Sequence, residues 1–186
     1  ADFSDSQSSA IAAALSYLKI PLTTRVKVAQ VGPNAPANGL LKAGDIITAV
    51  DGTPVNKPEQ MPPLVRSKKP GTVVTFSLLV NKIPQDVAVP VGPNPRNPAQ
   101  GYVGVLGSTE YSGPFPITFG LQDVGGPSAG TMFALGIVDK LTPENLSDDK
   151  IVAGTGTIDP KGEVGKIGGI QQKMYAARDN GAQLFL

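Results

Sequence analysis

Apolar and polar residues alternate over several stretches of residues 24–91, as they do in strands that bury one face. The alternation predicts strands at 25–31, 46–50, 73–80 and 86–91. The pair Asp51-Gly52 follows the second of these runs and is typical of a tight hairpin turn. Residues 57–68 predict a short helix, although this segment holds three prolines. We therefore expect a small β-rich domain over residues 21–92.

Apolar residues return at helical spacing on either side of this domain. Residues 5–18 predict a helix, for which Ser4 or Asp5 is a suitable N-cap. It would form an N-terminal element, residues 1–20, that precedes the β-rich domain. Residues 93–100 hold three prolines and no periodicity, which predicts a semi-rigid linker.

Strand and helix patterns alternate in the remaining part of the chain, residues 101–186. The predicted strands cover 103–106, 116–121 and 151–158, and the predicted helices cover 128–141 and 169–180. Gly181 is placed to end the second helix. The fold class is therefore α+β, with a β-rich domain followed by an α/β domain.

Composition narrows the chemistry that this chain can perform. Of 186 residues, 40% are hydrophobic and 17% are charged, which is typical of a globular protein. The net charge is +1 without a basic cluster, which argues against a nucleic-acid partner. The chain has no cysteine and no histidine, so disulfides, thiol chemistry, Cys or His metal sites and a Ser-His-Asp triad are all excluded.

The two ends of the sequence suggest a piece of a longer protein. The chain begins at Ala1 without methionine and stops within the apolar, strand-like stretch 182–186. No apolar run reaches the length of about 18 residues that a membrane span needs. We therefore expect a C-terminus that is truncated within the second domain.

The most informative stretch is Gly125-Gly126-Pro127-Ser128-Ala129-Gly130, which turns sharply into the helix predicted for 128–141. A serine at a helix N-terminus lies beside backbone N–H groups that have no partner within the helix. The amides around Gly126 and Ser128 could stabilise an oxyanion formed when Ser128 attacks a carbonyl group. Since histidine is absent, lysine is the best candidate for the base.

Lys173 is the lysine best placed for this role. It lies one turn into the helix that Gly168-Gly169 opens. A free lysine has a pKa of about 10.4, so a lysine that acts as a base needs apolar surroundings that disfavour its ammonium form. Its apolar neighbours Ile170 and Met174 favour such a pocket. Two other lysines, Lys161 and Lys166, lie among turn residues and should be exposed.

Residues 39–47 and 50–55, Gly-Leu-Leu-Lys-Ala-Gly-Asp-Ile-Ile and Val-Asp-Gly-Thr-Pro-Val, resemble PDZ domains of the bacterial type. The resemblance implies a domain that binds extended peptides by adding them as a strand. We expect the groove along residues 22–28, facing the 57–68 helix and lined by Leu22, Thr24 and Val26. The alternative is a domain that only packs against its neighbour.

Three motifs of the second domain together resemble the proteolytic domain of the Lon family. They are Gly126-Pro127-Ser128-Ala129-Gly130, Thr155-Gly156, and Ile167-Gly168-Gly169 followed by Lys173. The resemblance implies a catalytic dyad of Ser128 and Lys173, with Thr155 supporting the lysine.

With the PDZ domain, the chain resembles the Lon-like PDZ proteases of bacteria. This implies an ATP-independent serine endopeptidase that needs no cofactor or metal. Its partners would be polypeptide substrates recruited or oriented by the PDZ domain, and it could form a homo-oligomer. It would lie on the extracytoplasmic face of a membrane, anchored by an N-terminal segment absent from this chain.

Two positions depart from the Lon pattern. Gly125 stands where Lon proteins commonly have an aspartate, and Thr157 stands where they have a glutamate. These departures leave open a second hypothesis, in which the chain is a catalytically inactive PDZ scaffold that binds peptides.

Overall fold

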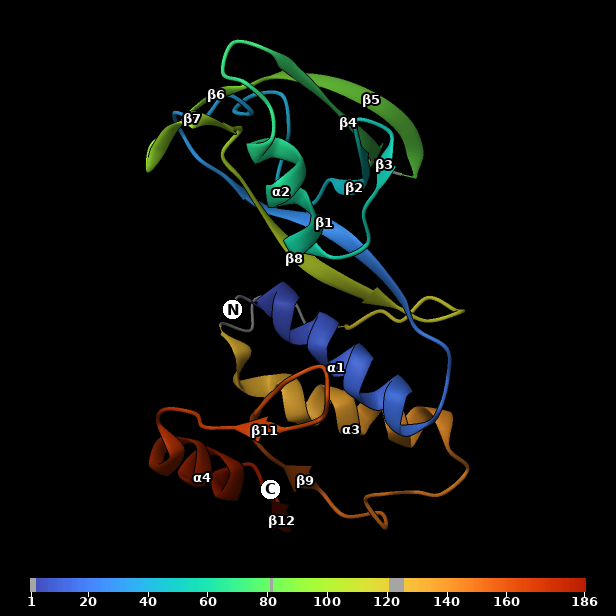
Figure 1. The fold of residues 1–186 in the computed structure, drawn as a ribbon. Coiled ribbons are helices and arrows are strands. Elements are labelled where there is room, and N and C mark those ends of the chain that lie inside the picture. The colour runs from blue at the N-terminus through green and yellow to red at the C-terminus, as the bar shows by residue number, and fades with distance from the viewer. Residues whose placement is uncertain (1–2, 81, 121–125) are drawn as a thin grey trace. The chain divides into compact units, whose positions relative to one another are not determined.

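The computed structural model describes residues 3–80, 82–120 and 126–186. Their contacts divide the chain into two compact units. One unit comprises residues 24–110, and the other comprises residues 1–23 together with 111–186. The chain passes between the units twice, first in β1 (Thr23–Val31) and again in β8 (Val105–Ser112) (Figure 1). The first unit is therefore inserted into the sequence of the second.

The unit formed by residues 24–110 is built on an antiparallel sheet. Its strands are β1, β2 (Ile46–Val50), β3 (Thr53–Pro54), β4 (Val73–Val80), β5 (Ile83–Pro90) and β8, in the order β5-β4-β2-β1-β8 with β3 beside β2. The four strands predicted in this region are confirmed. Asp51 and Gly52 join β2 to β3 with φ values of 47° and 72°, so the predicted hairpin turn is confirmed as well.

One face of this sheet is covered by a short 3₁₀ turn, η1 (Pro58–Gln60), and the helix α2 (Met61–Arg66). They confirm the helix predicted for 57–68. A proline lies in the first turn of each, where its missing N–H leaves no helical hydrogen bond unmade. Met61 and Val65 point into the core, against apolar residues such as Val26, Ile47 and Phe76.

The prediction of a linker at 93–100 is wrong. Residues of this stretch form the hairpin of β6 (Gly92–Asn94) and β7 (Asn97–Tyr102). The side chains of Asn94 and Asn97 accept hydrogen bonds from the backbone N–H groups of Arg96 and Ala99 and so hold the turn. A two-stranded ribbon tolerates prolines because the backbone groups on its outer edges pair with no further strand, so a missing N–H leaves no ladder hydrogen bond unmade. The packed unit accordingly continues past the predicted linker, to residue 110.

The turn residue Asp51 also contributes to the stability of this unit through its carboxylate. Its carboxylate accepts hydrogen bonds from the Lys68 ammonium, with which it pairs, and from the Thr75 backbone N–H. These bonds hold the pKa of Asp51 below its usual value. The carboxylate therefore stabilises the fold at neutral pH, and this contribution is lost as the pH falls through its lowered pKa.

We expect Asp51→Asn to lower the free energy of unfolding at pH 7 by about 0.5–1 kcal/mol, a small effect because the pair is partly exposed. Asparagine also tolerates positive φ, so the substitution mainly removes the charge. Urea unfolding at pH 7 and pH 2.5 measures the effect, which should shrink at the lower pH. The exposed Asp86, replaced in the same way, is the control. An equal loss at both pH values would contradict this assignment.

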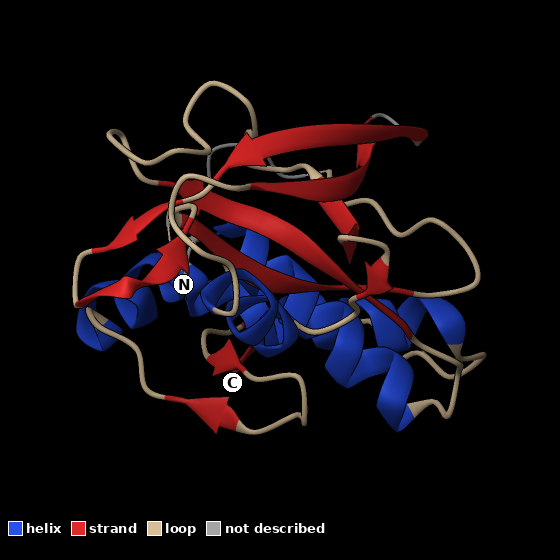
Figure 2. Cartoon of the chain, turned by 45° about the horizontal axis from the view of Figure 1, so that its top comes forward, coloured by secondary structure: helices blue, strands red, loops and turns tan. Residues whose placement is uncertain are grey.

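The second unit contains three α-helices and short strands in its described part (Figure 2). Its elements are α1 (Phe3–Tyr17), η2 (Pro127–Ala129), α3 (Gly130–Leu141), β9 (Val152–Ala153), β10 (Thr157–Ile158), β11 (Val164–Gly165), α4 (Ile170–Asp179) and β12 (Leu184–Phe185). β12 pairs in parallel with β9, and β10 pairs antiparallel with β11. None of the helices in the described ranges is long and apolar enough to span a membrane.

Helix α1 confirms the helix predicted for 5–18, with two differences. It already includes Phe3, so Ser4 and Asp5 lie within the helix rather than before it. It also packs in the second unit, against α3, rather than standing before the β-rich domain. The small side chains of Ala10, Ala13 and Ala14 let the two helices approach closely; the α3 residues in this core are Phe133, Ala134, Ile137 and Val138.

The predicted helices 128–141 and 169–180 are confirmed by η2 with α3 and by α4. Gly181 follows α4 with φ 77°, as expected of a glycine that ends a helix. Of the strand predicted for 116–121, residues 116–120 form no strand, and residue 121 lies outside the described residues. The strand predicted for 151–158 is interrupted and becomes β9 and β10.

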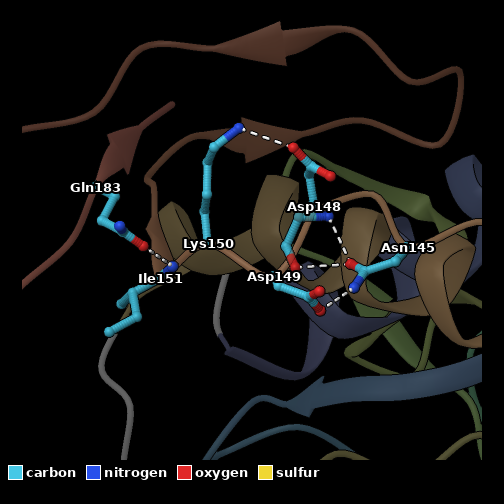
Figure 3. Close-up of polar contacts among 7 residues, drawn as sticks. Asn145, Asp148, Asp149, Lys150, Ile151 and Gln183 are labelled. Atoms are coloured by element: carbon cyan, nitrogen blue, oxygen red, sulfur yellow. Dashed lines mark hydrogen bonds and ion pairs between the residues drawn. The ribbon is translucent and has the colours of Figure 1, made fainter.

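Polar contacts hold the loop between α3 and β9 (Figure 3). Asn145 Nδ2 donates to Asp149 Oδ1 over 2.7 Å, and Lys150 Nζ lies 3.1 Å from Asp148 Oδ2. The Ile151 N–H donates to Gln183 Oε1 over 3.0 Å. That last bond joins the loop to Gln183, the residue before β12. β9 and β12 pair directly after it, and the segment that carries Thr155 follows β9.

Candidate active site

Ser128 lies in the 3₁₀ turn η2, which runs directly into α3. Gly126 precedes the turn with φ 82° and ψ 173°, a backbone conformation that strongly favours glycine. Pro127 then fixes the first position of the turn. The sequence motif thus sets the sharp bend, and the predicted location of Ser128 at the start of a helix is confirmed.

The structure brings together the three side chains singled out in the sequence. Lys173 Nζ lies 2.7 Å from Ser128 Oγ and 2.9 Å from Thr155 Oγ1. Lys173 comes from the first turn of α4, whose preceding residue, Gly169, has φ 68°. Thr155 comes from the segment between β9 and β10.

The direction of the hydrogen bonds follows from the single proton of the Thr155 hydroxyl. Thr155 Oγ1 donates that proton to the Ser128 carbonyl over 3.0 Å. It therefore accepts, and does not donate, in its contact with Lys173. An amine that gives one N–H to Thr155 can direct its lone pair to Ser128 once it is uncharged. Thr155 thereby fixes the orientation of the lysine amine.

The same segment also fixes the backbone of the serine. The Gly156 N–H donates to the Ser128 carbonyl over 2.8 Å, and the Thr131 N–H donates to the Gly156 carbonyl over 3.0 Å. A Cβ at position 156 would collide with the Thr131 hydroxyl. The glycine of the Thr-Gly pair is thus needed so that this segment can approach α3.

The surroundings of Lys173 differ from the sequence-based expectation. Its side chain is half-buried, but Ile170 and Met174 on the same helix are 44% and 53% exposed. The described residues therefore do not form the apolar pocket expected around the amine. They also include no carboxylate in an ion pair with Lys173, whose described partners are two hydroxyl groups.

Lys161 and Lys166 are exposed, as predicted for lysines in turns. Of the two positions that depart from the Lon pattern, Gly125 lies outside the described residues. Thr157 lies in β10, and its carbonyl accepts a hydrogen bond from Thr131 Oγ1 over 3.2 Å.

The predicted peptide groove along residues 22–28 is wrong. β1 lies between β2 and β8, so both of its edges are already hydrogen-bonded. Val26 is fully buried, and Leu22 packs in the core of the other unit, with α1 and α3. Among the described strands, β8 is the last on this side of the sheet, with β1 beside it. Leu22, Thr24 and Val26 therefore do not offer a strand to a peptide.

A cavity of about 670 Å³ lies instead between α2 and the start of β8. Pro58, Met61, Pro62 and Val65 line one side, and residues 101–107 line the other. The tip of the β6–β7 hairpin, including Arg96, also lines the cavity.

Val103 and Gly104 join β7 to β8, and the chain bends at Gly104, which has φ 75°. Within the described part of the chain, the N–H groups of Val103 and Gly104 have no acceptor. A signal was present in the sequence, since the apolar run 101–107 is interrupted by Gly101, Gly104 and Gly107.

Comparisons with known proteins match two parts of the chain to two families, although the first match includes residues 3–23, which belong to the other unit, and ends before residue 110. A family model of the PDZ domain matches residues 3–91. A family model of the Lon protease (S16) C-terminal proteolytic domain matches residues 120–186. No curated protein matches the chain.

Among solved structures, the chain is similar to the PDZ domain of an SdrC-like protein from Listeria innocua. The two share 25% identity over 45% of this chain and 92% of that one, with a TM-score of 0.40. A protein from Geobacillus thermodenitrificans shares 38% identity over 41% and 88% of the two chains, with a TM-score of 0.37. The PDZ domain of an SdrC-like protein from Listeria monocytogenes shares 25% identity over 43% and 83%, with a TM-score of 0.38.

The chain is thus mixed α+β, with an antiparallel β-sheet unit inserted into the sequence of a helix-and-strand unit. The S16 domain implies a serine peptidase, and hence polypeptide substrates. The chain is a PDZ domain followed by the proteolytic domain of the Lon protease (S16) family.

Proposed function

We propose that this chain is an ATP-independent serine endopeptidase in which Ser128 is the nucleophile and Lys173 is the general base. The observation that carries the proposal is the 2.7 Å contact between Lys173 Nζ and Ser128 Oγ. This distance lies within the range required for proton transfer between a nucleophile and its base. Peptide hydrolysis is itself favourable, so the chemistry assigned to these residues needs no nucleotide.

The proposed reaction begins when uncharged Lys173 takes the proton of the Ser128 hydroxyl, whose oxygen attacks the substrate carbonyl. The amides of Gly126 and Ser128 stabilise the resulting oxyanion. Lys173 then gives its proton to the leaving amine, and an acyl group remains on Ser128. Water, activated by the same amine, releases the acyl group. Thr155 holds the amine in line through its 2.9 Å contact.

One observation favours an inactive scaffold as the alternative. The apolar neighbours of Lys173 on α4, Ile170 and Met174, are exposed and do not enclose its amine. The two functions differ in the reactivity of Ser128. Digestion of casein by the wild-type chain and by Ser128→Ala, together with labelling by a fluorophosphonate, distinguishes them.

Two parts of the proposal are supported only by the resemblance to Lon-like PDZ proteases. They are a position on the extracytoplasmic face of a bacterial membrane, anchored by an N-terminal segment outside this chain, and assembly into a homo-oligomer. Membrane fractionation of the producing cells and analytical ultracentrifugation would test them.

The PDZ unit, in this proposal, binds the C-terminus of a polypeptide along the start of β8, the last described strand on its side of the sheet. A peptide could pair with this edge as an added strand and place its apolar side chains against Met61 and Val65. Val103 and Gly104 line the cavity, and we propose that their N–H groups bind the terminal carboxylate.

We expect a labelled ten-residue peptide with a C-terminal valine to bind at least about tenfold more tightly than its amidated form, because amidation removes the charge that these N–H groups would bind. Fluorescence anisotropy measures both affinities. Leu106→Asp should weaken binding, whereas Ile83→Asp should not. Both side chains are 61% exposed, and they lie on β8 and β5 at opposite edges of the same sheet. Equal affinity for the two peptides would contradict carboxylate recognition.

A further inference from the structure

A buried hydroxyl group of helix α1 bonds to the nucleophile turn, η2 (Pro127–Ala129), which carries Ser128. Ser6 Oγ donates a hydrogen bond to the Pro127 carbonyl over 3.1 Å, across 121 residues of sequence. Ser6 is only 4% exposed. The same carbonyl also accepts the N–H of Gly130, the residue that ends the η2 turn. The orientation of the Pro127 carbonyl is therefore set from two sides.

This carbonyl belongs to the peptide group that also contains the Ser128 N–H. A trans peptide group is planar, so the N–H points opposite to the C=O. A hydrogen bond that holds the Pro127 carbonyl consequently holds the direction of the Ser128 N–H as well. That N–H is one of the two donors proposed for the oxyanion.

The next peptide group is held from another element. The Ser128 carbonyl accepts hydrogen bonds from Thr155 Oγ1 and from the Gly156 N–H, at 3.0 Å and 2.8 Å. Both peptide groups that flank the Cα of Ser128 are thus fixed, one partly by α1 and the other by residues 155–156.

The sequence of the nucleophile turn allows α1 to come this close. A Cβ at position 130 would lie 3.0 Å from Ser6 Oγ and 3.1 Å from the Ile158 side chain. Both distances are shorter than ordinary carbon contacts. The last glycine of the Gly-Pro-Ser-Ala-Gly motif therefore provides the space that Ser6 needs.

We infer that Ser6 is a positioning residue of the proteolytic site, which orients the Ser128 N–H toward the oxyanion by holding the Pro127 carbonyl. The inference rests on the proposed peptidase function. It also makes α1, whose sequence precedes the PDZ unit, a functional part of the proteolytic unit.

The test compares Ser6→Ala with Ser8→Ala in the full chain. Ser8 is a matched control because it lies on the same helix, is 7% exposed, and uses its hydroxyl to accept the Tyr111 N–H at 3.0 Å. Hydrogen exchange at the amides of residues 128–131, measured by NMR, reports on the turn whether or not the chain is active. The kcat and KM for a peptide substrate report on catalysis.

Ser6→Ala should speed exchange at these amides by at least about tenfold more than Ser8→Ala does, since it removes one anchor of the turn. It should also lower kcat about tenfold with little change in KM, because the oxyanion donor matters most in the transition state. Similar effects of the two variants on exchange would overturn the inference. If the wild type neither cleaves nor labels, the proposed function fails, while the exchange comparison still decides whether Ser6 holds the turn.

Discussion

Replacing Ser128 by alanine should abolish the cleavage of casein and the reaction with a fluorophosphonate. The hydroxyl is the only nucleophile that the proposed mechanism uses, so we expect a loss of at least about 10⁴-fold in kcat. The fold should survive, because the side-chain oxygen has one described hydrogen bond, with Lys173, and the turn is held through the carbonyls of Pro127 and Ser128. Urea unfolding of the variant measures this stability.

A matched control is Ser147→Ala in the same unit. The Ser147 hydroxyl also makes one short hydrogen bond, to Asn145 Oδ1 at 2.7 Å, but it lies in the loop after α3. We expect this variant to cleave and label at the wild-type rate. Retained cleavage by Ser128→Ala would contradict the assignment of Ser128 as the nucleophile. Labelling of a different residue in the wild type by the fluorophosphonate would contradict it as well.

Local patterns predicted the parts of the fold that local chemistry determines. The turn at Asp51-Gly52 adopts the positive φ values that this pair favours, and Gly126-Pro127 makes the bend ahead of Ser128. In the PDZ unit, buried residues alternate with more exposed ones along most of β4. In each case neighbouring residues carry the whole signal, and no distant contact is needed to interpret it.

Contacts between distant segments were not predictable in the same way. Alternation indicates which face of β1 is buried, but not which strands lie beside it, so the groove was expected at an edge that β8 already covers. The alanines of α1 predicted a helix without identifying its partner, α3. The prolines of 93–100 suggest a linker. The hairpin is held instead by the side chains of Asn94 and Asn97, whose hydrogen bonds leave no periodic pattern in the sequence.

The candidate site shows the same division. Ser128, Thr155 and Lys173 were identified because their glycine-rich motifs resemble those of the Lon family, and the structure places their side chains together. Ser6 could not be identified, because a serine in a helix is usually exposed. Its burial and its bond to Pro127 depend on the packing of α1 against η2. Three of these four residues were therefore accessible from sequence, and the fourth required the fold.

Lys173→Met should abolish cleavage by at least about 10³-fold while Ser128 remains in place, because methionine keeps much of the side-chain volume and cannot accept a proton. Lys173→Arg should be equally inactive, since a guanidinium stays charged at any pH that the protein tolerates. The matched control is Lys166→Met, at an exposed lysine of the same unit, which should leave kcat unchanged.

The pH dependence separates a base from a structural cation at position 173. If the amine must be uncharged to take the Ser128 proton, kcat/KM of the wild type should rise as the pH is raised above neutrality. A lysine that only donates hydrogen bonds to Ser128 and Thr155 would require the opposite, since its ammonium form is the better donor. Initial rates between pH 6 and 10, limited to the range in which the chain stays folded, distinguish the two. Activity that falls across this range would reject Lys173 as the base and keep it only as a hydrogen-bond donor to the nucleophile.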